Sequence, residues 1–147
     1  MDVGLIKIKI KSESGSLPSY ETAGASGMDI KAFLEEDVII PPGEISIIKT
    51  GLFIELPGGY EAQLRARSGL AARHGIGLVN GIGTIDSDYR GEIKAILINW
   101  GKKPVTIKSG DRVAQLVIAK YEKAELVLAD ELDKTARDGG GFGHTGV

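Results

Sequence analysis

The stretch Leu5-Ile6-Lys7-Ile8-Lys9-Ile10-Lys11 alternates lysine with isoleucine near the start of the chain. Side chains two residues apart point to the same face of a β-strand, so this spacing places the isoleucines on one face and the lysines on the other. The stretch therefore predicts a half-buried strand, with one face against a core and the other in solvent. The first expectation for this fold is β structure.

Further β-type stretches follow at short intervals. The predicted strands cover residues 29–34, 37–40, 44–49, 51–56, 61–65, 92–98, 105–107 and 113–121. Most are separated by Pro or Gly, as in Pro41-Pro42-Gly43 and Ser109-Gly110-Asp111, where a chain reversal needs a fixed or positive φ. Many short strands joined in this way predict an all-β sandwich or barrel.

One segment has the character of a helix. Residues 68–74 read Ser-Gly-Leu-Ala-Ala-Arg-His, which predicts one or two helical turns. We expect Ser68 to be the N-cap and Gly75 to be the C-terminal stop, since these residue types favour those positions.

Length and composition indicate one folded domain with a distinct tail. The chain has 147 residues, of which 42% are hydrophobic and 26% charged, proportions typical of ordinary globular proteins. From residue 131 the sequence becomes polar and then glycine-rich, so it cannot build a core of its own. We expect a β core over residues 1–130 and a C-terminal arm over residues 131–147, either disordered or ordered on another surface.

Charge and residue usage exclude several classes of protein. The net charge is -2 and the lysines and arginines are scattered, which disfavours a polynucleotide partner but leaves room for a single small anion. The absence of cysteine excludes disulfides and thiolate zinc sites, and two histidines alone cannot build a zinc site. No stretch resembles a signal peptide or a membrane span. We therefore expect a cytoplasmic protein without a membrane partner.

Asp86 and Asp88 stand two residues apart in the segment Gly-Thr-Ile-Asp-Ser-Asp-Tyr-Arg-Gly of residues 83–91. In a strand-like context both would point to one face, where two like charges must be exposed, paired with cations, or turned toward a metal or ligand. An isolated Asp-x-Asp is more often a solvated turn. The residues Tyr89, Arg90 and Gly91, which a plain turn does not need, favour a functional site.

The tail is a second candidate site. Residues 139–146 read Gly-Gly-Gly-Phe-Gly-His-Thr-Gly, and their N–H groups have little side-chain hindrance, so the backbone could wrap a phosphate. The alternative to a phosphate-binding segment is a flexible, linker-like terminus. Phe142 and Arg137 argue against that alternative, because an aromatic ring can stack on a base and a guanidinium can bind phosphate.

Arg67-Ser68-Gly69 is a third possible anion site, since helix N-termini and guanidinium groups both attract phosphate. The alternative is a capped helix with a surface arginine. Asn80 and Gln115 can each donate and accept hydrogen bonds, but by themselves they carry no functional signal.

Taken together and in order, five segments resemble the five motifs of the dUTPase family. They are residues 25–32, 67–71, 80–91, 110–116 and 137–146, and the third is the closest match. The resemblance is specific because all five occur jointly and span the chain from Ala25 to Gly146. Two positions depart from the pattern: Asp138 stands where the family usually has glycine, and His144 stands where serine is common.

The resemblance implies a jelly-roll-like fold and a homotrimer with three shared active sites, each completed by the C-terminal arm of another subunit. It also implies the reaction: dUTP and water give dUMP and pyrophosphate, with Mg2+ on the triphosphate and attack at the α-phosphorus. Such an activity keeps uracil out of DNA and supplies dUMP for thymidylate synthesis.

The resemblance further implies a role for each matching residue. Asp86 matches the carboxylate that activates the water and receives the 3'-hydroxyl. Asp29 matches a carboxylate in the water network near the metal. The residues that match contacts to the nucleoside are Tyr89 beneath the deoxyribose, Asn80 and Gly83 at the edge of uracil, and Phe142 over the base. Those that match contacts to the phosphates are Arg67, Ser68, Gly69, Gln115, Arg137, Gly143, His144 and Thr145.

Two other interpretations stay open. A relative of dCTP deaminase would share the fold but use different catalytic residues, and Tyr89-Arg90-Gly91 after Asp88 favours the dUTPase instead. A non-catalytic jelly-roll nucleotide-binding module would not require Asp86 in a water-activating position.

Overall fold

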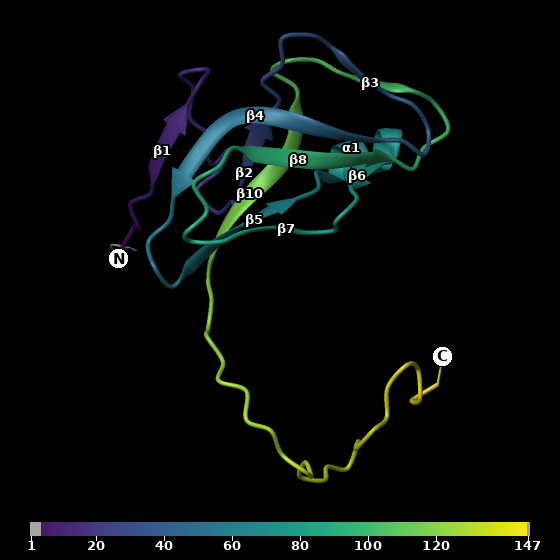
Figure 1. Cartoon of the computed structure of the whole chain (residues 1–147). Coiled ribbons are helices and arrows are strands. Elements are labelled where there is room, and N and C mark those ends of the chain that lie inside the picture. Colours follow the sequence, from purple (N-terminus) through teal and green to yellow (C-terminus); the bar gives the residue numbers. More distant parts are fainter. Residues whose placement is uncertain (1–3, 147) are drawn as a thin grey trace.

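The computed structural model describes residues 4–146 and contains antiparallel sheets and one short helix (Figure 1). The strands are β1 Lys9–Ser12, β2 Gly27–Lys31, β3 Val38–Ile40, β4 Ile45–Glu55, β5 Tyr60–Arg65, β6 Ile76–Leu78, β7 Gly83–Ile85, β8 Ile93–Asn99, β9 Val105–Ile107 and β10 Arg112–Lys120, and α1 is Ser68–His74. Two four-stranded sheets have the orders β1-β4-β8-β6 and β2-β10-β5-β7, and β3 pairs with β9. The predicted all-β, jelly-roll-like fold with one short helix is confirmed.

The two four-stranded sheets share one hydrophobic core. Ile48 of β4 and Ile30 of β2 are both fully buried in it. In β8 the alternate residues Ile93, Ala95 and Leu97 are buried and Lys94 is exposed, as a strand with one face on the core requires. The buried alternate side chains of β8 are therefore part of the core that joins the two sheets.

The first strand is shorter than the alternation over residues 5–11 predicted. Pairing with β4 begins at Lys9, opposite Glu55, which is the last residue of β4. Residues 4–8 have no partner strand, and Leu5 is 90% exposed. Ile8 and Ile10 do pack against the core, so the predicted apolar face is confirmed at these two positions, although only Ile10 lies in the paired strand.

The two strands predicted at 44–49 and 51–56 form the single strand β4. Gly51 has a φ of +67°, and the register with β8 shifts between Lys49 and Leu52, which defines a β-bulge. The glycine bends a continuous strand rather than ending it. β6 and β7 were not predicted, because each has only three residues, one of them glycine, and shows no alternation.

Helix α1 has the predicted bounds but a different N-cap. Arg67 is the cap residue, and Ser68 is the first helical residue and makes no capping hydrogen bond. Gly75 ends the helix as predicted, with a φ of +69° and its N–H donated to the Ala71 carbonyl. A Cβ there would lie 2.6 Å from the backbone N of Gly101, so the position has no room for a side chain.

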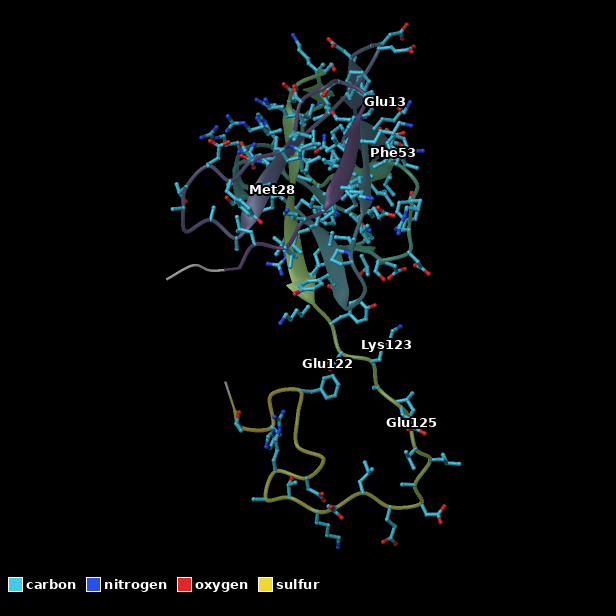
Figure 2. The ribbon with its side chains drawn as sticks, turned by 90° about the vertical axis from the view of Figure 1, so that its left-hand side faces the viewer. Glu13, Met28, Phe53, Glu122, Lys123 and Glu125 are labelled. Carbon is cyan, nitrogen blue, oxygen red and sulfur yellow. The ribbon has the colours of Figure 1, made fainter. Side chains whose placement is uncertain are left out.

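After Lys120 the chain leaves the body as an extended tail, on which Glu122, Lys123 and Glu125 lie (Figure 2). Residues 122–139 are all exposed, and the sheets end before residue 130. The division of the chain into a β core over residues 1–130 and a C-terminal arm over residues 131–147 that completes a site of another subunit remains a prediction. Within residues 4–146 no helix is long and apolar enough to cross a membrane.

Candidate functional site

Asp86 lies at the surface immediately after β7. In that strand Gly83 pairs with Leu64 and Ile85 with Ala62, and Ile85 is buried. The buried isoleucine fixes the end of the strand, and Asp86 begins a turn that the Tyr89 N–H closes by donating to the Asp86 carbonyl at 3.1 Å. Asp86 and Asp88 therefore lie in a turn and not in a strand, which corrects the alternation inferred for them.

The turn is braced by its own neighbours. The Arg90 Nη1 group donates to the Ser87 carbonyl at 2.7 Å, and its Nη2 atom lies 3.6 Å from the Glu55 carboxylate on β4. The Tyr89 hydroxyl donates to the Glu92 carbonyl at 2.8 Å. Asp86 thus stands on a surface turn whose backbone is tied to the opposite sheet, unlike a free loop.

Asn80 and Gly83 lie together beside β5. A Cβ added at Gly83 would come within 3.1 Å of the Leu64 Cβ and 3.7 Å of the Asn80 Nδ2 atom. The glycine therefore lets the β7 backbone approach β5 closely while the Asn80 amide lies beside it. Three of the predicted residues, Asn80, Gly83 and Asp86, therefore lie on one segment of the chain whose strand β7 pairs with β5.

A second group of predicted residues surrounds Asp29 on β2. One carboxylate oxygen of Asp29 lies 3.1 Å from Arg67 Nε, and the other lies 3.7 Å from Arg112 Nη1. Arg67 also donates to the Arg112 carbonyl at 3.3 Å. Two guanidinium groups on one carboxylate leave a net positive charge at this edge of the sheet, which suits an anionic ligand.

Gln115 of β10 joins this group through the sheet register. It pairs with Asp29 on one side and with Arg65 of β5 on the other, and its Nε2 group donates to the Ala66 carbonyl at 3.1 Å. Arg67 follows directly, and Ser68 and Gly69 are the first two residues of α1, where backbone N–H groups have no partner within the helix. Amide, hydroxyl and backbone donors therefore gather where the cations lie.

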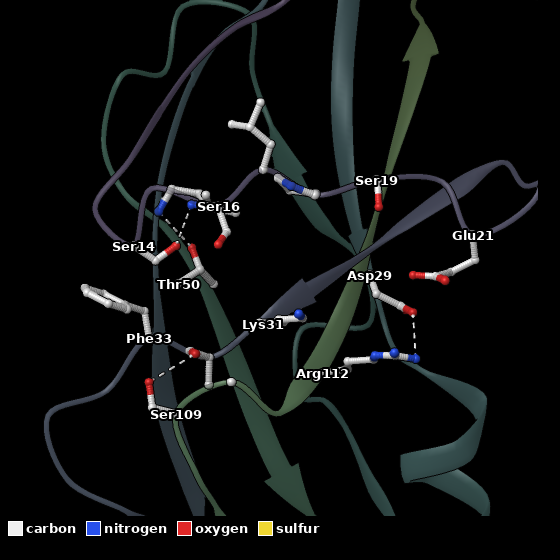
Figure 3. Close-up of a pocket in the computed structure, with 15 residues that line it drawn as sticks. Ser14, Ser16, Ser19, Glu21, Asp29, Lys31, Phe33, Thr50, Ser109 and Arg112 are labelled. Atoms are coloured by element: carbon white, nitrogen blue, oxygen red, sulfur yellow. Dashed lines mark hydrogen bonds and ion pairs between the residues drawn. The ribbon is translucent and has the colours of Figure 1, made fainter.

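A pocket of about 390 Å³ opens beside Asp29 (Figure 3). Asp29 and Arg112 face each other on one side of it, with Glu21 nearby, and Ser14, Ser16 and Thr50 line the other side. The Asp29 side chain is 21% exposed, so water can reach it.

The two groups lie at opposite ends of β5. Asp86 follows the residue that pairs with Ala62, whereas Gln115 pairs with Arg65, next to α1. With about 3.3 Å per residue along a strand and about 4.8 Å between strands, the Asp86 and Gln115 backbones are roughly 16 Å apart. Figure 1 shows the segment after β7 and helix α1 at different ends of this sheet. One chain therefore does not bring Asp86 to the phosphate-binding candidates.

The remaining predicted residues lie on the tail, away from both groups. Its own shallow hollow is lined by Arg137, Gly141, Phe142, Gly143, His144 and Thr145. The Phe142 ring is fully exposed, and Arg137 Nε donates to the Gly140 carbonyl at 2.6 Å. Asp138, which replaces the glycine usual in the motif, has a φ of +46°, a conformation in which glycine is favoured.

The described residues fit a magnesium ion only indirectly. Within residues 4–146 no group of three or more His, Asp or Glu side chains could hold a metal ion. Both Asp29 oxygens are already paired with arginines, but the carboxylate borders the pocket and its side chain is 21% exposed. Mg2+ keeps several waters and can take its other ligands from phosphate oxygens, so contact with Asp29 through water suits this arrangement.

Sequence reasoning assigned no role to Arg112 and Glu92. Arg112 lies inside the fourth motif, but its partner Asp29 is brought to it by strand pairing. The Glu92 carboxylate accepts a hydrogen bond from the Gly51 N–H at 3.1 Å, at the bulge of β4. Neither contact has a local sequence signal, because each partner is distant along the chain.

Comparisons with known proteins agree over nearly the whole chain. A family model described as dUTPase matches residues 13–146. A deoxyuridine 5'-triphosphate nucleotidohydrolase of Thermoanaerobacter sp. is 53% identical over 145 residues, covering 97% of this chain and 98% of the relative. Another, of Finegoldia magna, is 50% identical over 142 residues, covering 96% and 99%. The solved Staphylococcus bacteriophage 80alpha dUTPase with dUPNHPP is 25% identical, with a TM-score of 0.86 over 96% of this chain and 99% of that one.

Proposed function

This chain belongs to the dUTPase family and is a dUTP diphosphatase, and from that premise we propose how it works: Asp86 activates a water for attack on the α-phosphorus of dUTP. The products are dUMP and pyrophosphate. This reaction keeps uracil out of DNA and supplies dUMP for thymidylate synthesis.

The observation that carries this mechanism is the placement of Asp86. Its carboxylate is exposed on a turn whose backbone is fixed by the Tyr89 N–H and by Arg90. Water is a poor nucleophile, and a positioned carboxylate can accept its proton while the new P–O bond forms. The rigidity of the turn supplies the position, and the same carboxylate can receive the 3'-hydroxyl of the deoxyribose.

The residues around Asp86, from Asn80 to Tyr89, account for the choice of nucleotide. Tyr89 packs beneath the deoxyribose, where a ribose 2'-hydroxyl would collide with the ring. The Gly83 backbone and the Asn80 amide present donors and acceptors to the edge of uracil and leave no room for the 5-methyl group of thymine. Cytosine would leave polar groups unpaired, which is costly in a closed site.

The cationic group at the other end of the sheet binds the phosphates. Gln115, Arg67 and the N–H groups of Ser68 and Gly69 all lie around Asp29 and provide donors for phosphate oxygens. The arm residues Arg137, Gly143, His144 and Thr145 close over the outer phosphates, and Phe142 stacks on uracil.

These parts meet only when several copies of the chain assemble. Asp86 and Gln115 are roughly 16 Å apart in one chain by strand geometry, too far for both to contact the same phosphate group. A second copy that brings its Asp29 group to the Asp86 turn would complete the site, and the exposed arm of a copy would cover it. We therefore propose a homotrimer with three shared active sites, in keeping with closed symmetric assembly.

Mg2+ bound to the triphosphate would offset its negative charge as pyrophosphate leaves. Asp29 would orient water around that ion, while Arg67 and Arg112 hold the carboxylate in place.

The direct test offers the purified chain dUTP, dCTP, dTTP and UTP separately with Mg2+, and measures pyrophosphate and ammonia. We expect pyrophosphate from dUTP alone and no ammonia from any substrate. No pyrophosphate from dUTP would overturn the proposal, and ammonia from dCTP would identify a deaminase.

The assignment of Asp86 predicts that Asp86→Asn lowers kcat by about 10²- to 10⁴-fold, the range for loss of a general base. The amide is nearly the same size, so binding of dUPNHPP should change little, as titration calorimetry would measure. Asp88→Asn is the matched control on the same turn and should lose far less activity. Full turnover by the Asp86 variant would remove this residue from its role.

A further inference from the structure

Tyr121 connects the turn of residues 86–89, called here the catalytic turn, to the end of the last strand. Its backbone N–H donates to the Gly59 carbonyl at 3.0 Å, which extends β10 by one residue against the turn before β5. Its hydroxyl lies 3.4 Å from the Ser87 hydroxyl, and Ser87 stands between Asp86 and Asp88. Residues 122–139 are all exposed, so Tyr121 is the last partly buried residue before that stretch of the tail.

Ser87 is held from two directions. Its carbonyl accepts the Arg90 guanidinium, and its side chain meets Tyr121. Arg90 is itself paired with Glu55 of β4, whereas Tyr121 directly follows β10, in the other sheet. The turn that carries Asp86 is thus fastened to both four-stranded sheets, once through its backbone and once through a side chain.

From these contacts we infer that Tyr121 is a positioning residue for the dUTP hydrolysis proposed above: its hydroxyl, paired with Ser87, fixes the turn that aims Asp86 at the substrate. Tyr121 does not touch the nucleotide itself. It acts through Ser87, the residue adjacent to the base.

Two further features agree with an ordered contact. The hydrogen bond with Ser87, with a smaller effect of the Gly59 backbone, lowers the pKa of the Tyr121 phenol below its usual value. The Lys123 ammonium lies 5.5 Å from the centre of the Tyr121 ring, within the range of a cation–π contact. The Tyr121 side chain therefore contacts both Ser87 of the turn and Lys123 of the tail.

The size of the effect follows from the geometry. A distance of 3.4 Å is long for two hydroxyl groups, so the contact orients the turn without being indispensable to it. Tyr121→Phe removes one hydroxyl and keeps the ring, and Ser87→Ala removes the other. We expect each change to lower kcat about 3- to 10-fold with KM nearly unchanged, because misplacing a catalytic group by a fraction of an ångström weakens the transition state and not substrate binding.

The test is a double-mutant cycle on kcat with the full-length chain. If the two hydroxyls act as one unit, the variant with both substitutions loses no more activity than either single variant. Tyr60→Phe is the matched control. Tyr60 begins β5 and pairs with Lys120, the residue before Tyr121, and its hydroxyl has no hydrogen-bond partner within residues 4–146. Wild-type kcat in Tyr121→Phe, or losses that multiply independently, would overturn the inference.

A second measurement needs no substrate. The Tyr89 N–H closes the catalytic turn by bonding to the Asp86 carbonyl, so its hydrogen-exchange rate reports how firmly the turn is held. Tyr121→Phe and Ser87→Ala should both speed this exchange several-fold, while the Tyr121 N–H keeps its wild-type rate. An unchanged Tyr89 rate would overturn the inference even if dUTP is hydrolysed. If the wild-type chain releases no pyrophosphate from dUTP and the Tyr89 N–H still exchanges faster in both variants, only the proposed function is overturned.

Discussion

At the scale of single residues, Gly91 determines where the Tyr89 ring can lie. A Cβ at position 91 would overlap the Tyr89 hydroxyl and sit within 2.9 Å of a ring carbon. That hydroxyl is tied to the Glu92 carbonyl, so the ring cannot move away without losing its hydrogen bond. If Tyr89 excludes the 2'-hydroxyl of ribonucleotides, Gly91 is needed for that exclusion, because a side chain there would displace the Tyr89 ring.

Gly91→Ala should therefore weaken the discrimination between dUTP and UTP. We expect the ratio of the two kcat/KM values to fall by about 10-fold or more, mostly through slower dUTP hydrolysis, because the displaced ring no longer fits the deoxyribose. Steady-state kinetics with both nucleotides measure the ratio. Gly58→Ala is the control, since no atom lies within 4 Å of a Cβ there and φ is not in the left-handed region. An unchanged ratio in Gly91→Ala would show that Tyr89 does not set the sugar specificity.

At the scale of secondary-structure elements, the junction between α1 and β6 depends on Gly75. Its φ of +69° ends the helix, and its carbonyl accepts the Trp100 N–H at 2.8 Å, which joins the helix end to the end of β8. Gly101 approaches so closely that no Cβ fits. None of the residues of the short helix is fully buried and Leu70 is only partly buried against the core, so this close contact contributes to holding the helix in place.

Gly75→Ala should lower the free energy of unfolding by about 2–5 kcal/mol, of which about 1–2 kcal/mol is the cost of a left-handed backbone and the rest steric overlap. Gly110→Ala separates the two contributions, since Gly110 also has a positive φ, of +92°, but nothing lies within 4 Å of its Cβ. It should cost only about 1–2 kcal/mol. Denaturant unfolding at one fixed protein concentration measures both values. Equal losses would show that the contact with Gly101 can relax.

Elements with a clear period were predictable, and those defined by their partners were not. β8 and β10 follow from runs of alternating or continuous apolar residues, and Gly75 gave the end of α1. β1 was misjudged because its start depends on where β4 ends, and β4 was divided because a glycine can either break or bend a strand. A motif was enough to propose Asp86, Tyr89 and Asn80 as candidate site residues, whereas Arg112 and Tyr121 contact partners that only folding brings near.

At the scale of the whole molecule, the single chain is well folded but its candidate site is divided among three places. The Asp86 turn, the group around Asp29 and the tail do not meet, although each has residues suited to one part of a nucleoside triphosphate. The tail contributes nothing to the core, since its apolar residues Leu126 and Leu128 are 93% and 99% exposed. Removing its last part should therefore leave the folded body intact.

Deleting residues 137–147 should thus yield a chain with wild-type secondary structure and assembly but little dUTP hydrolysis, since the role proposed for the arm is to bind substrate and its residues do not pack in the core.

Complementation then tests whether sites are shared between subunits. When this chain is unfolded, mixed in equal amounts with Asp86→Asn and reassembled, a site that takes Asp86 from one subunit and the arm from another should be complete in about one quarter of cases. Activity should return to about that fraction of wild type, while each variant reassembled alone stays inactive. The control replaces the Asp86→Asn chain with one carrying both changes, which cannot supply an arm and should restore nothing. If the mixture is as inactive as its parents, each chain completes its own site with its own arm.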